Sequence, residues 1–382
     1  MTAPAPLALY IHWPFCVAKC PYCDFNSHVR ETIDQTLWRE ALLRDLAHEA
    51  ALLPGRQLGS IFFGGGTPSL MPPETIAALI DAAAGHWSFA DDIEISMEAN
   101  PNSAEAARFA AVAQAGVNRL SLGLQALDDA ALRFLGRAHD VAEGLAALDA
   151  AQRSVDRVSI DLIYARPGQS LADWDSELTR ALGFGTDHLS LYQLTIEPGT
   201  RFETDVRKGD FTPTDPDEAA DLFELTQAMT TAARRPAYEV SNHAAPGQES
   251  RHNLAYWRYG DYAGIGPGAH GRRGSHATVR HKKPENWLSA LERNGHGLAE
   301  ERALPPAEQA GEALMMGLRL AEGVDLAALA ARTGVARETL LDETAVARLA
   351  GHGLLVREGD RLIVTPQGML LLDGILAEIV AV

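Results

Sequence analysis

The stretch Tyr10-Ile-His-Trp-Pro-Phe-Cys-Val-Ala-Lys-Cys-Pro-Tyr-Cys-Asp-Phe25 contains the three cysteines of the 382-residue chain, Cys16, Cys20 and Cys23. Thiolates spaced three and then two residues apart can wrap one loop around a cubane iron–sulfur cluster, because soft sulfur ligands select such clusters or zinc over hard cations. A structural zinc site would require four protein ligands, and a catalytic thiol would require one cysteine beside a base. We therefore expect an iron–sulfur cluster with one open iron, and keep zinc or inert thiols as the alternative.

Composition bounds the class of protein around this loop. With 46% hydrophobic and 22% charged residues the chain resembles a soluble globular protein, and no apolar run approaches the roughly 20 residues that span a bilayer. The N-terminus, Met1 to Leu7, lacks a charged region followed by a full apolar stretch, so we expect no secretory signal and a cytoplasmic protein with reduced cysteines. The formal net charge of −18 disfavours nonspecific binding to nucleic acid, whose backbone requires a basic surface.

One segment departs from this acidic balance. Residues 251–283 contain seven arginines and lysines against a single acidic residue, Asp261, which gives a local charge of +6. Such a segment is either a solvated face or a binding surface for an anionic ligand, and the sequence leaves both open.

Short apolar runs alternate with stretches of helical period, such as residues 35–53, 73–84, 103–115 and 171–182. This alternation predicts repeated β-α units and a parallel sheet. Six units over about 240 residues favour an α/β fold with a partial (β/α)6 barrel, and a doubly wound sheet is the alternative. The predicted strands are residues 7–15, 60–63, 93–97, 119–125, 157–164 and 188–195.

We expect the barrel in residues 1–240, a connecting segment in 241–304, and a small α+β region with a winged-helix-like end in 305–382. The last region is predicted from helical periods followed by a short ribbon around residues 354–365, with Gly359 at its turn. Winged-helix domains often bind DNA, which makes a cluster-bearing regulator a second hypothesis. Residues 300–382 carry seven arginines and no lysine against thirteen acidic residues, so charge argues against DNA binding and favours a protein-facing cap.

The pattern Cys-x-x-x-Cys-x-x-Cys, with Tyr22 before the third cysteine, resembles the signature of the radical S-adenosylmethionine (SAM) superfamily. That resemblance implies a partial barrel and a [4Fe-4S] cluster whose open iron binds the amino and carboxylate groups of SAM. Within the superfamily, Tyr-Ile-His-x-Pro-Phe-Cys is similar to the group that contains oxygen-independent coproporphyrinogen III oxidase (HemN) and the heme chaperone HemW. The likeness covers nearly the whole chain.

Reactive residues in such barrels lie where the strands end. Gly64-Gly65-Gly66-Thr67-Pro68 follows the second predicted strand and resembles the element that holds the SAM amino group. Arg137 is a natural partner for the SAM carboxylate, and an aspartate inside an apolar strand, Asp161, is seldom without a partner. The resemblance implies SAM contacts from Tyr10, Gly65, Gly66, Thr67, Glu98, Gln125, Arg137 and Asp161. Arg166 stands where relatives commonly have leucine, and the sequence does not show whether it faces ligand or solvent.

Two functions remain within the group. The enzyme would use SAM as a source of a radical that abstracts a propionate hydrogen from coproporphyrinogen III, whereas the chaperone would bind heme and pass it to an acceptor protein. The oxidases carry a further cysteine where this chain has Phe25, and a long N-terminal extension where the first strand here begins at Leu7. His-Asn-x-x-Tyr-Trp at residues 252–257 is similar to the motif of the chaperone branch. We therefore favour the chaperone, and whether it also turns over SAM as an enzyme stays open.

Heme is a large apolar plane whose iron accepts imidazole and whose propionates require cations. Residues 251–283 combine histidine, aromatic residues and arginines, so we expect heme to contact His252, Tyr256 and Trp257, with His12 and His270 as alternative iron ligands. The expected partners are heme and a heme-accepting protein, for which a respiratory, membrane-associated protein is one candidate. The expected cofactors are the [4Fe-4S] cluster, SAM and heme.

Overall fold

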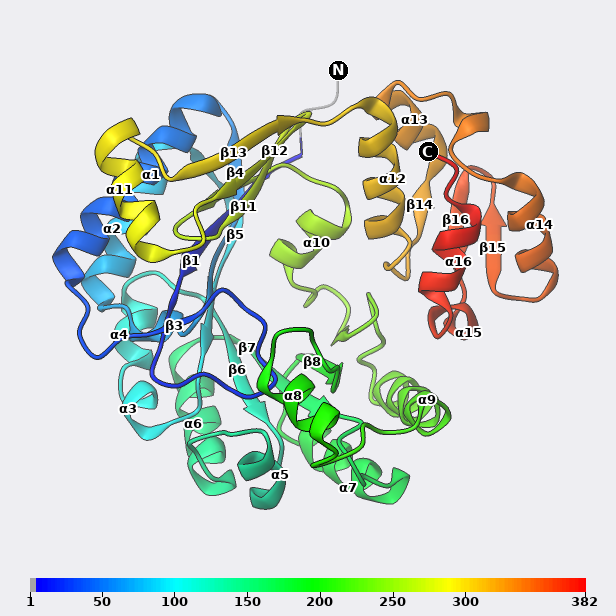
Figure 1. Cartoon of the computed structure of the whole chain (residues 1–382), viewed down its shortest axis with the longest axis horizontal. Coiled ribbons are helices and arrows are strands. Elements are labelled where there is room, and N and C mark those ends of the chain that lie inside the picture. The colour runs from blue at the N-terminus through cyan, green and yellow to red at the C-terminus, as the bar shows by residue number, and fades with distance from the viewer. Residues whose placement is uncertain (1–4) are drawn as a thin grey trace.

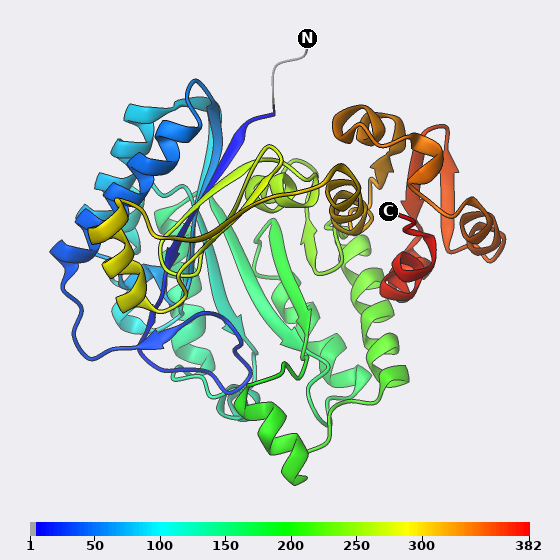
Figure 2. The same ribbon diagram turned by 45° about the horizontal axis from the view of Figure 1, so that its top comes forward.

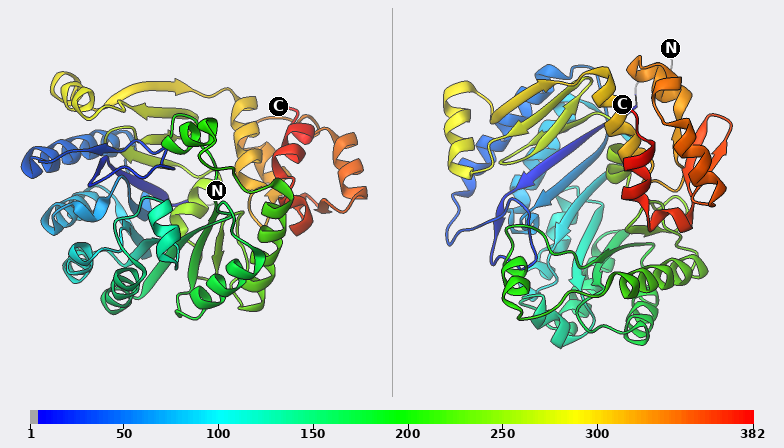
Figure 3. Two further views of the ribbon diagram at one scale, coloured as in Figure 1. Left: turned by 60° about the horizontal axis from the view of Figure 1, so that its bottom comes forward. Right: turned by 45° about the vertical axis from the view of Figure 1, so that its right-hand side comes forward.

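The computed structural model describes residues 5–382, and a mixed sheet of eleven strands forms its centre (Figure 1). Six parallel strands lie side by side in chain order, which excludes a doubly wound sheet because that fold reverses its strand order at a switch point. With helices along the outer face of the curved sheet, this is the predicted partial barrel (Figure 3). The strands are β1 (Leu7–Trp13), β4 (Gln57–Gly65), β5 (Ser88–Ala99), β6 (Arg119–Gln125), β7 (Arg157–Tyr164) and β8 (His188–Gln193).

Helices cover the outer face because every second side chain of each strand is apolar. In β1, for example, Leu7, Leu9, Ile11 and Trp13 are all fully buried against that layer. Polar N-caps begin the helices: Asp140 and Ser170 each form a capping box at the start of a helix. The covering helices are α1 (Gln35–Leu52), α2 (Pro73–His86), α3 (Ser103–Ala106), α4 (Phe109–Gln114), α5 (Asp129–Phe134), α6 (Val141–Ser154), α7 (Leu171–Leu182), α8 (Arg201–Lys208) and α9 (Pro216–Ala232).

The alternate positions of the same strands point inward, and polar residues occupy many of them, so the inner face of the barrel is polar. Arg119 and His188 are buried at the amino ends of their strands, and the buried Glu94 lies in register with the buried Ser60, whereas Glu98 and Asp161 lie nearer the carboxyl ends. The barrel therefore has a polar floor and a polar mouth, and the cysteine loop is at the mouth.

Residues 241–304, the expected connecting segment, add strands to both edges of the central sheet. β10 (Tyr262–Ile265) pairs in parallel with β1, and β11 (His270–Arg273), β12 (His276–Arg280) and β13 (Leu298–Ala303) continue the same sheet in antiparallel fashion. At the opposite edge β9 (Asn242–Ala244) pairs with β8. Two helices complete the segment, α10 (Arg251–Trp257) and α11 (Pro284–Asn294).

The arginines of the basic segment 251–283 form neither an unpaired solvated face nor an open anion surface, whereas Lys282 and Lys283 at its end are exposed and pair with no carboxylate in residues 5–382. Arg280 is fully buried and pairs with Asp45 at 2.6 Å and Glu49 at 2.8 Å, both from α1. Arg272 and Arg273 are also buried, and they form ion pairs with Glu312 and Glu301, respectively. Buried cations require such partners, so most of the local charge is neutralised by carboxylates from distant parts of the chain.

A second hydrophobic core belongs to residues beyond 305, with helices α12 (Pro306–Gly317), α13 (Leu326–Thr333) and α14 (Glu343–Gly351) followed by a ribbon of β15 (Leu355–Glu358) and β16 (Arg361–Val364). β14 (Val324–Asp325) joins the ribbon, and α15 (Pro366–Met369) and α16 (Leu372–Ile379) end the chain. This order of elements is that of a winged-helix-like unit, and it lies beside the barrel in Figure 2. No helix within residues 5–382 combines the length and the apolar character that crossing a bilayer demands.

Candidate functional site

The three cysteines lie in a loop between β1 and β3 (His28–Val29), at the edge where the parallel strands end. Cys16 itself ends the short strand β2 (Phe15–Cys16), which pairs with β3. All three thiols are partly exposed and free. Burial raises the pKa of Cys16 and of Cys23, and the neighbouring Cys20 also raises both, as expected for sulfurs that lie near one another.

Two of the cysteine sulfurs accept hydrogen bonds, which would stabilise the negative charge of thiolate ligands. The Thr67 hydroxyl donates to Cys16 Sγ at 3.5 Å, and Arg137 Nη1 donates to Cys20 Sγ at 3.4 Å. Asn100 connects these two donors, because it donates to Thr67 Oγ1 at 3.0 Å and accepts from Arg137 Nη2 at 2.6 Å. Hydrogen bonds to cluster sulfurs tune and orient such ligands, so this network fits a bound iron–sulfur cluster.

Asn100 was not predicted from the sequence. Its position two residues beyond the strand-end Glu98, before Pro101, is the only signal that could have indicated it. Within residues 5–382 no three His, Cys, Asp or Glu side chains converge on a single metal ion. A cubane is held at its corners, so its thiolates stand further apart than the ligands of one ion.

The glycine run after β4 packs directly on the cysteine loop. Gly66 N donates to Trp13 O at 2.7 Å and Thr67 N donates to Phe15 O at 2.8 Å. A Cβ on Gly66 would lie 2.6 Å from Phe15 O, and Gly65 has a φ of +113°, which favours glycine. Glycine is therefore required for this close approach, as the predicted SAM-binding element implies.

Two carboxyl groups face the same space. Glu98 accepts from Gly65 N at 3.1 Å, and Asp161 accepts from the Ser121 hydroxyl at 3.0 Å. Burial and, to a smaller extent, the nearby Asp161 carboxyl raise the pKa of Glu98 to about 8. Burial also raises the pKa of Asp161. Carboxyl groups that are costly to ionise together are stabilised as anions by a nearby cation, which a sulfonium and an ammonium group would provide.

Arg137 offers a donor for a ligand. Its Nη2 also donates to Gly123 O at 3.2 Å, but its Nε is buried without a hydrogen-bond partner. A buried unpaired donor is costly, so a ligand acceptor such as a carboxylate fits there. Gln125 ends β6 with a φ of +66°, which is rare for a residue other than glycine and ends the strand beside Arg137. The residues present thus fit a SAM-bound [4Fe-4S] cluster.

Two further residues are placed by the structure. Tyr10 lies deeper in the barrel, where its hydroxyl bonds His12 Nδ1 at 2.9 Å. Arg166 is buried and paired with Glu177 from α7, so it faces neither ligand nor solvent.

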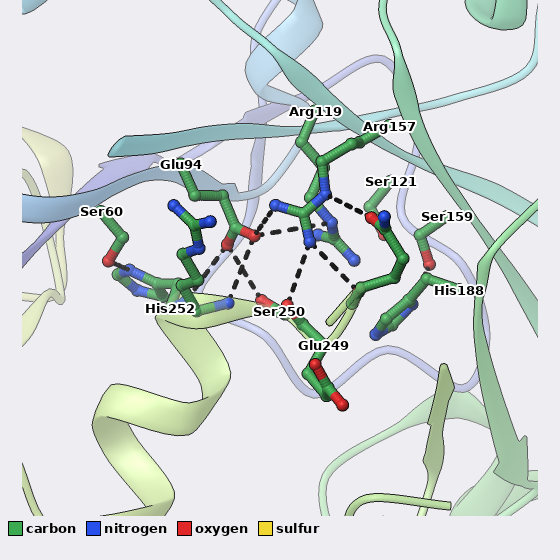
Figure 4. Close-up of polar contacts among 12 residues, drawn as sticks. Ser60, Glu94, Arg119, Ser121, Arg157, Ser159, His188, Glu249, Ser250 and His252 are labelled. Carbon is green, nitrogen blue, oxygen red and sulfur yellow. Dashed lines mark hydrogen bonds and ion pairs between the residues drawn. The ribbon is translucent and has the colours of Figure 1, made fainter. Parts of the chain in front are cut away.

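The predicted heme residue His252 lies on the barrel floor, where Figure 4 shows it beside Ser60 and Glu94. His252 is 1% exposed, with Nδ1 3.0 Å from Ser60 Oγ and Nε2 2.8 Å from the Tyr256 hydroxyl. Its ring stacks on Phe62, and burial lowers its pKa to about 3, so the imidazole is neutral. Ser60 precedes Gly65 by five residues of one strand, which is about 16 Å at 3.3 Å per residue.

Glu94 holds α10 against the barrel floor through hydrogen bonds. The carboxylate accepts from Ser250 Oγ and from the backbone N–H groups of Arg251 and His252, each at 3.2 Å, and pairs with Arg157 at 2.8 Å (Figure 4). Trp257, at the end of α10, lies under the Arg319 guanidinium at 4.8 Å. The assignment of heme to His252, Tyr256 and Trp257 stays a prediction, and in this structure it requires His252 to give up the hydrogen bond of the ring nitrogen that would bind iron.

A partial barrel with a three-cysteine loop at the carboxyl ends of its strands defines a radical SAM protein. The pattern of the Radical SAM superfamily matches residues 10–180, and that of the HemN C-terminal domain matches residues 304–371. Heme chaperone HemW of Escherichia coli is 38% identical, with 97% of each chain covered. The mitochondrial Radical S-adenosyl methionine domain-containing protein 1 of Bos taurus is 41% identical, with 84% of this chain and 76% of the relative covered.

The chain belongs to the HemW family. Among solved structures, coproporphyrinogen III oxidase (HemN) from Escherichia coli, described as a radical SAM enzyme, matches with a TM-score of 0.83 at 24% identity. The match covers 98% of this chain and 90% of that one, and it confirms the predicted fold.

Proposed function

We propose that the protein is a heme chaperone that holds a [4Fe-4S] cluster and SAM at the mouth of its barrel, binds heme, and passes it to an acceptor protein. The observation that carries the proposal is the 38% identity to a heme chaperone over 97% of both chains. The fold alone does not separate this function from the oxidase, because the 24% identical oxidase shares the fold. Phe25, where the oxidases have a further cysteine, supports the chaperone.

Within this proposal Cys16, Cys20 and Cys23 ligate the cluster. Thr67 and Arg137 donate to two of the sulfurs, which stabilises the thiolate form. We assign the amino group of SAM to the backbone of Gly65 and Gly66, which packs on the cysteine loop, and its carboxylate to Arg137 Nε, which has no hydrogen-bond partner. Glu98, Asp161, Gln125 and Tyr10 complete the expected SAM contacts.

When bound, the cluster supplies one electron to the SAM that it holds. The chain itself would position SAM and exclude water from it. The buried carboxyls of Glu98 and Asp161 would compensate the positive charge of SAM, and the cysteine loop would cover the mouth of the barrel. We also propose a cytoplasmic location, where the three cysteines would stay reduced and a cluster could be loaded, and a protein acceptor for heme.

A paired experiment tests the function. Purified, anaerobically reconstituted protein is titrated with hemin and is separately supplied with coproporphyrinogen III, SAM and a reductant. Heme binding without porphyrinogen turnover supports the chaperone. Turnover without stable heme binding would replace it by the oxidase.

A further inference from the structure

Asn26 joins the cysteine loop to the end of the β10–β12 sheet. Its Nδ2 donates to Pro267 O and to Lys282 O, both at 2.9 Å, and its backbone oxygen accepts from His12 Nε2 at 2.9 Å. The fit is close, because a Cβ on Gly268 would lie 2.3 Å from Asn26 Nδ2. The loop, dark blue in Figure 2, therefore lies against the segment from which His270 emerges.

Three histidines surround this junction, and they differ in whether a ring nitrogen is exposed and free to bind a ligand. His12 is buried, with both ring nitrogens engaged by Tyr10 and Asn26. His28 is half-buried, with Nε2 3.3 Å from Asn26 Oδ1. His270 is exposed, and its ring makes no hydrogen bond to any residue in the described range 5–382. The charges of His28 and His270 both act on His12, which places all three at one junction.

The surroundings of His270 suit a large apolar anion. Phe25, next to Asn26, is 61% exposed, and Val29 is 48% exposed, so this surface offers apolar contact as well as charge. Lys282 lies near enough to His270 to lower the pKa of that imidazole further, after burial, and it pairs with no carboxylate in residues 5–382. A free imidazole, an exposed aromatic ring and an unpaired ammonium are thus assembled beside the cysteine loop.

We propose that heme binds on this surface, with His270 as the axial iron ligand, Phe25 against the macrocycle and Lys282 at a propionate. This inference rests on the proposed heme-chaperone function and names its heme site. An exposed imidazole suits a carrier, because an acceptor protein can approach iron that is held at the surface. Asn26 places this ligand one contact away from the cysteine loop, whereas His252 lies on the barrel floor.

The test compares hemin titrations of wild-type protein, His270→Ala and His276→Ala. His276 is a matched control, since it is also exposed and lies at the opposite end of the same β11–β12 hairpin. We expect at least a tenfold loss of hemin affinity in His270→Ala and wild-type binding in His276→Ala. His270→Met should still bind hemin but shift the Soret band, because sulfur replaces nitrogen on the iron.

The possible results distinguish a wrong heme site from a wrong heme-chaperone function. No hemin binding by wild-type protein overturns the proposed function itself. Wild-type binding with an unaltered affinity and spectrum in His270→Ala overturns only the site, as does an equal loss in both alanine variants. Iron content and circular dichroism of each variant verify that the cluster and the fold are intact, and Lys282→Glu should weaken hemin binding several-fold.

Discussion

Replacing Glu94 by glutamine tests the conclusion that α10 is fixed to the barrel floor. The Glu94 carboxylate has no exposed surface and is the only carboxylate within reach of both Arg119 and Arg157 in the described residues. Glutamine keeps the size and one acceptor oxygen but removes the charge. Arg119, which is 3% exposed and 4.0 Å from Glu94, then has no anionic partner.

The expected loss of stability is about 3–5 kcal/mol, the usual cost of removing one partner of a buried ion pair. Arg157 reduces this value, because its side chain is 22% exposed and borders a cavity of about 290 Å³ in which water can solvate it. Weaker capping of α10 adds about 1 kcal/mol, since three donors at its start share the Glu94 carboxylate.

Urea denaturation followed by circular dichroism at pH 7 measures this loss, with Asp92→Asn as the control. Asp92 pairs with Arg251 at the surface, where its side chain is 72% exposed, so the control should lose less than about 1 kcal/mol. Burial raises the pKa of Glu94, but Arg119 and Arg157 outweigh that effect and leave it below its ordinary value. The stabilisation is therefore present above the unfolded pKa and fades as the pH falls below about 4.3. A Glu94→Gln variant within 1 kcal/mol of wild type at pH 7 would refute the reasoning.

Three further predictions concern the mouth of the barrel. Anaerobically reconstituted wild-type protein should hold about four irons per chain, and replacing Cys16, Cys20 and Cys23 together by alanine should abolish the cluster absorbance; full iron content in that variant would contradict the assignment. Arg137→Ala should weaken SAM binding by about 1.5–3 kcal/mol in calorimetry while the cluster remains, and an unchanged affinity would make Arg137 structural. Because burial raises the pKa of Glu98 to about 8, SAM-free protein should lose stability as the pH rises toward and through that value, by at most about 1.4 kcal/mol per pH unit. Glu98→Gln should lessen this loss between pH 7 and 9, and the same slope in both proteins would assign it to another group.

The six barrel strands could be predicted because each is a contiguous apolar run between helical periods. The strands β10 to β13 could not, since Arg272, Arg273 and Arg280 make their sequence look like a basic loop. Arg273 and Arg280 are accommodated in strands by Asp45 and Glu49, more than 220 residues earlier in the chain, and Arg272 pairs with Glu312, 40 residues later. A local pattern cannot show a partner at that separation, so the segment looked charged where the fold makes it nearly neutral.

The candidate site was only partly predictable for the same reason, because a local pattern does not show contacts between distant residues. The cysteine loop and the glycine run are contiguous motifs, and the structure brings them into contact as the resemblance implied. Asn100 connects them through Thr67 and Arg137, and no spacing rule indicates such a bridge. His252 was chosen for the motif around it, but a motif does not tell whether an imidazole is exposed like His270 or buried like His252.

The motif at residues 252–257 has a physical role that does not require it to touch heme. On one side α10 bonds the barrel floor through His252, Ser60 and Glu94. On the other side Trp257 lies under Arg319, and the two following residues, Arg258 and Tyr259, bond Glu322 and Glu312 of the C-terminal unit. The helix α10 is therefore one of several connections between the barrel and the C-terminal unit, because Arg272 of β11 also pairs with Glu312, and Tyr238 O accepts from Ala321 N. Since α10 bonds both parts, movement of the C-terminal unit would shift the residues that this helix holds on the barrel floor.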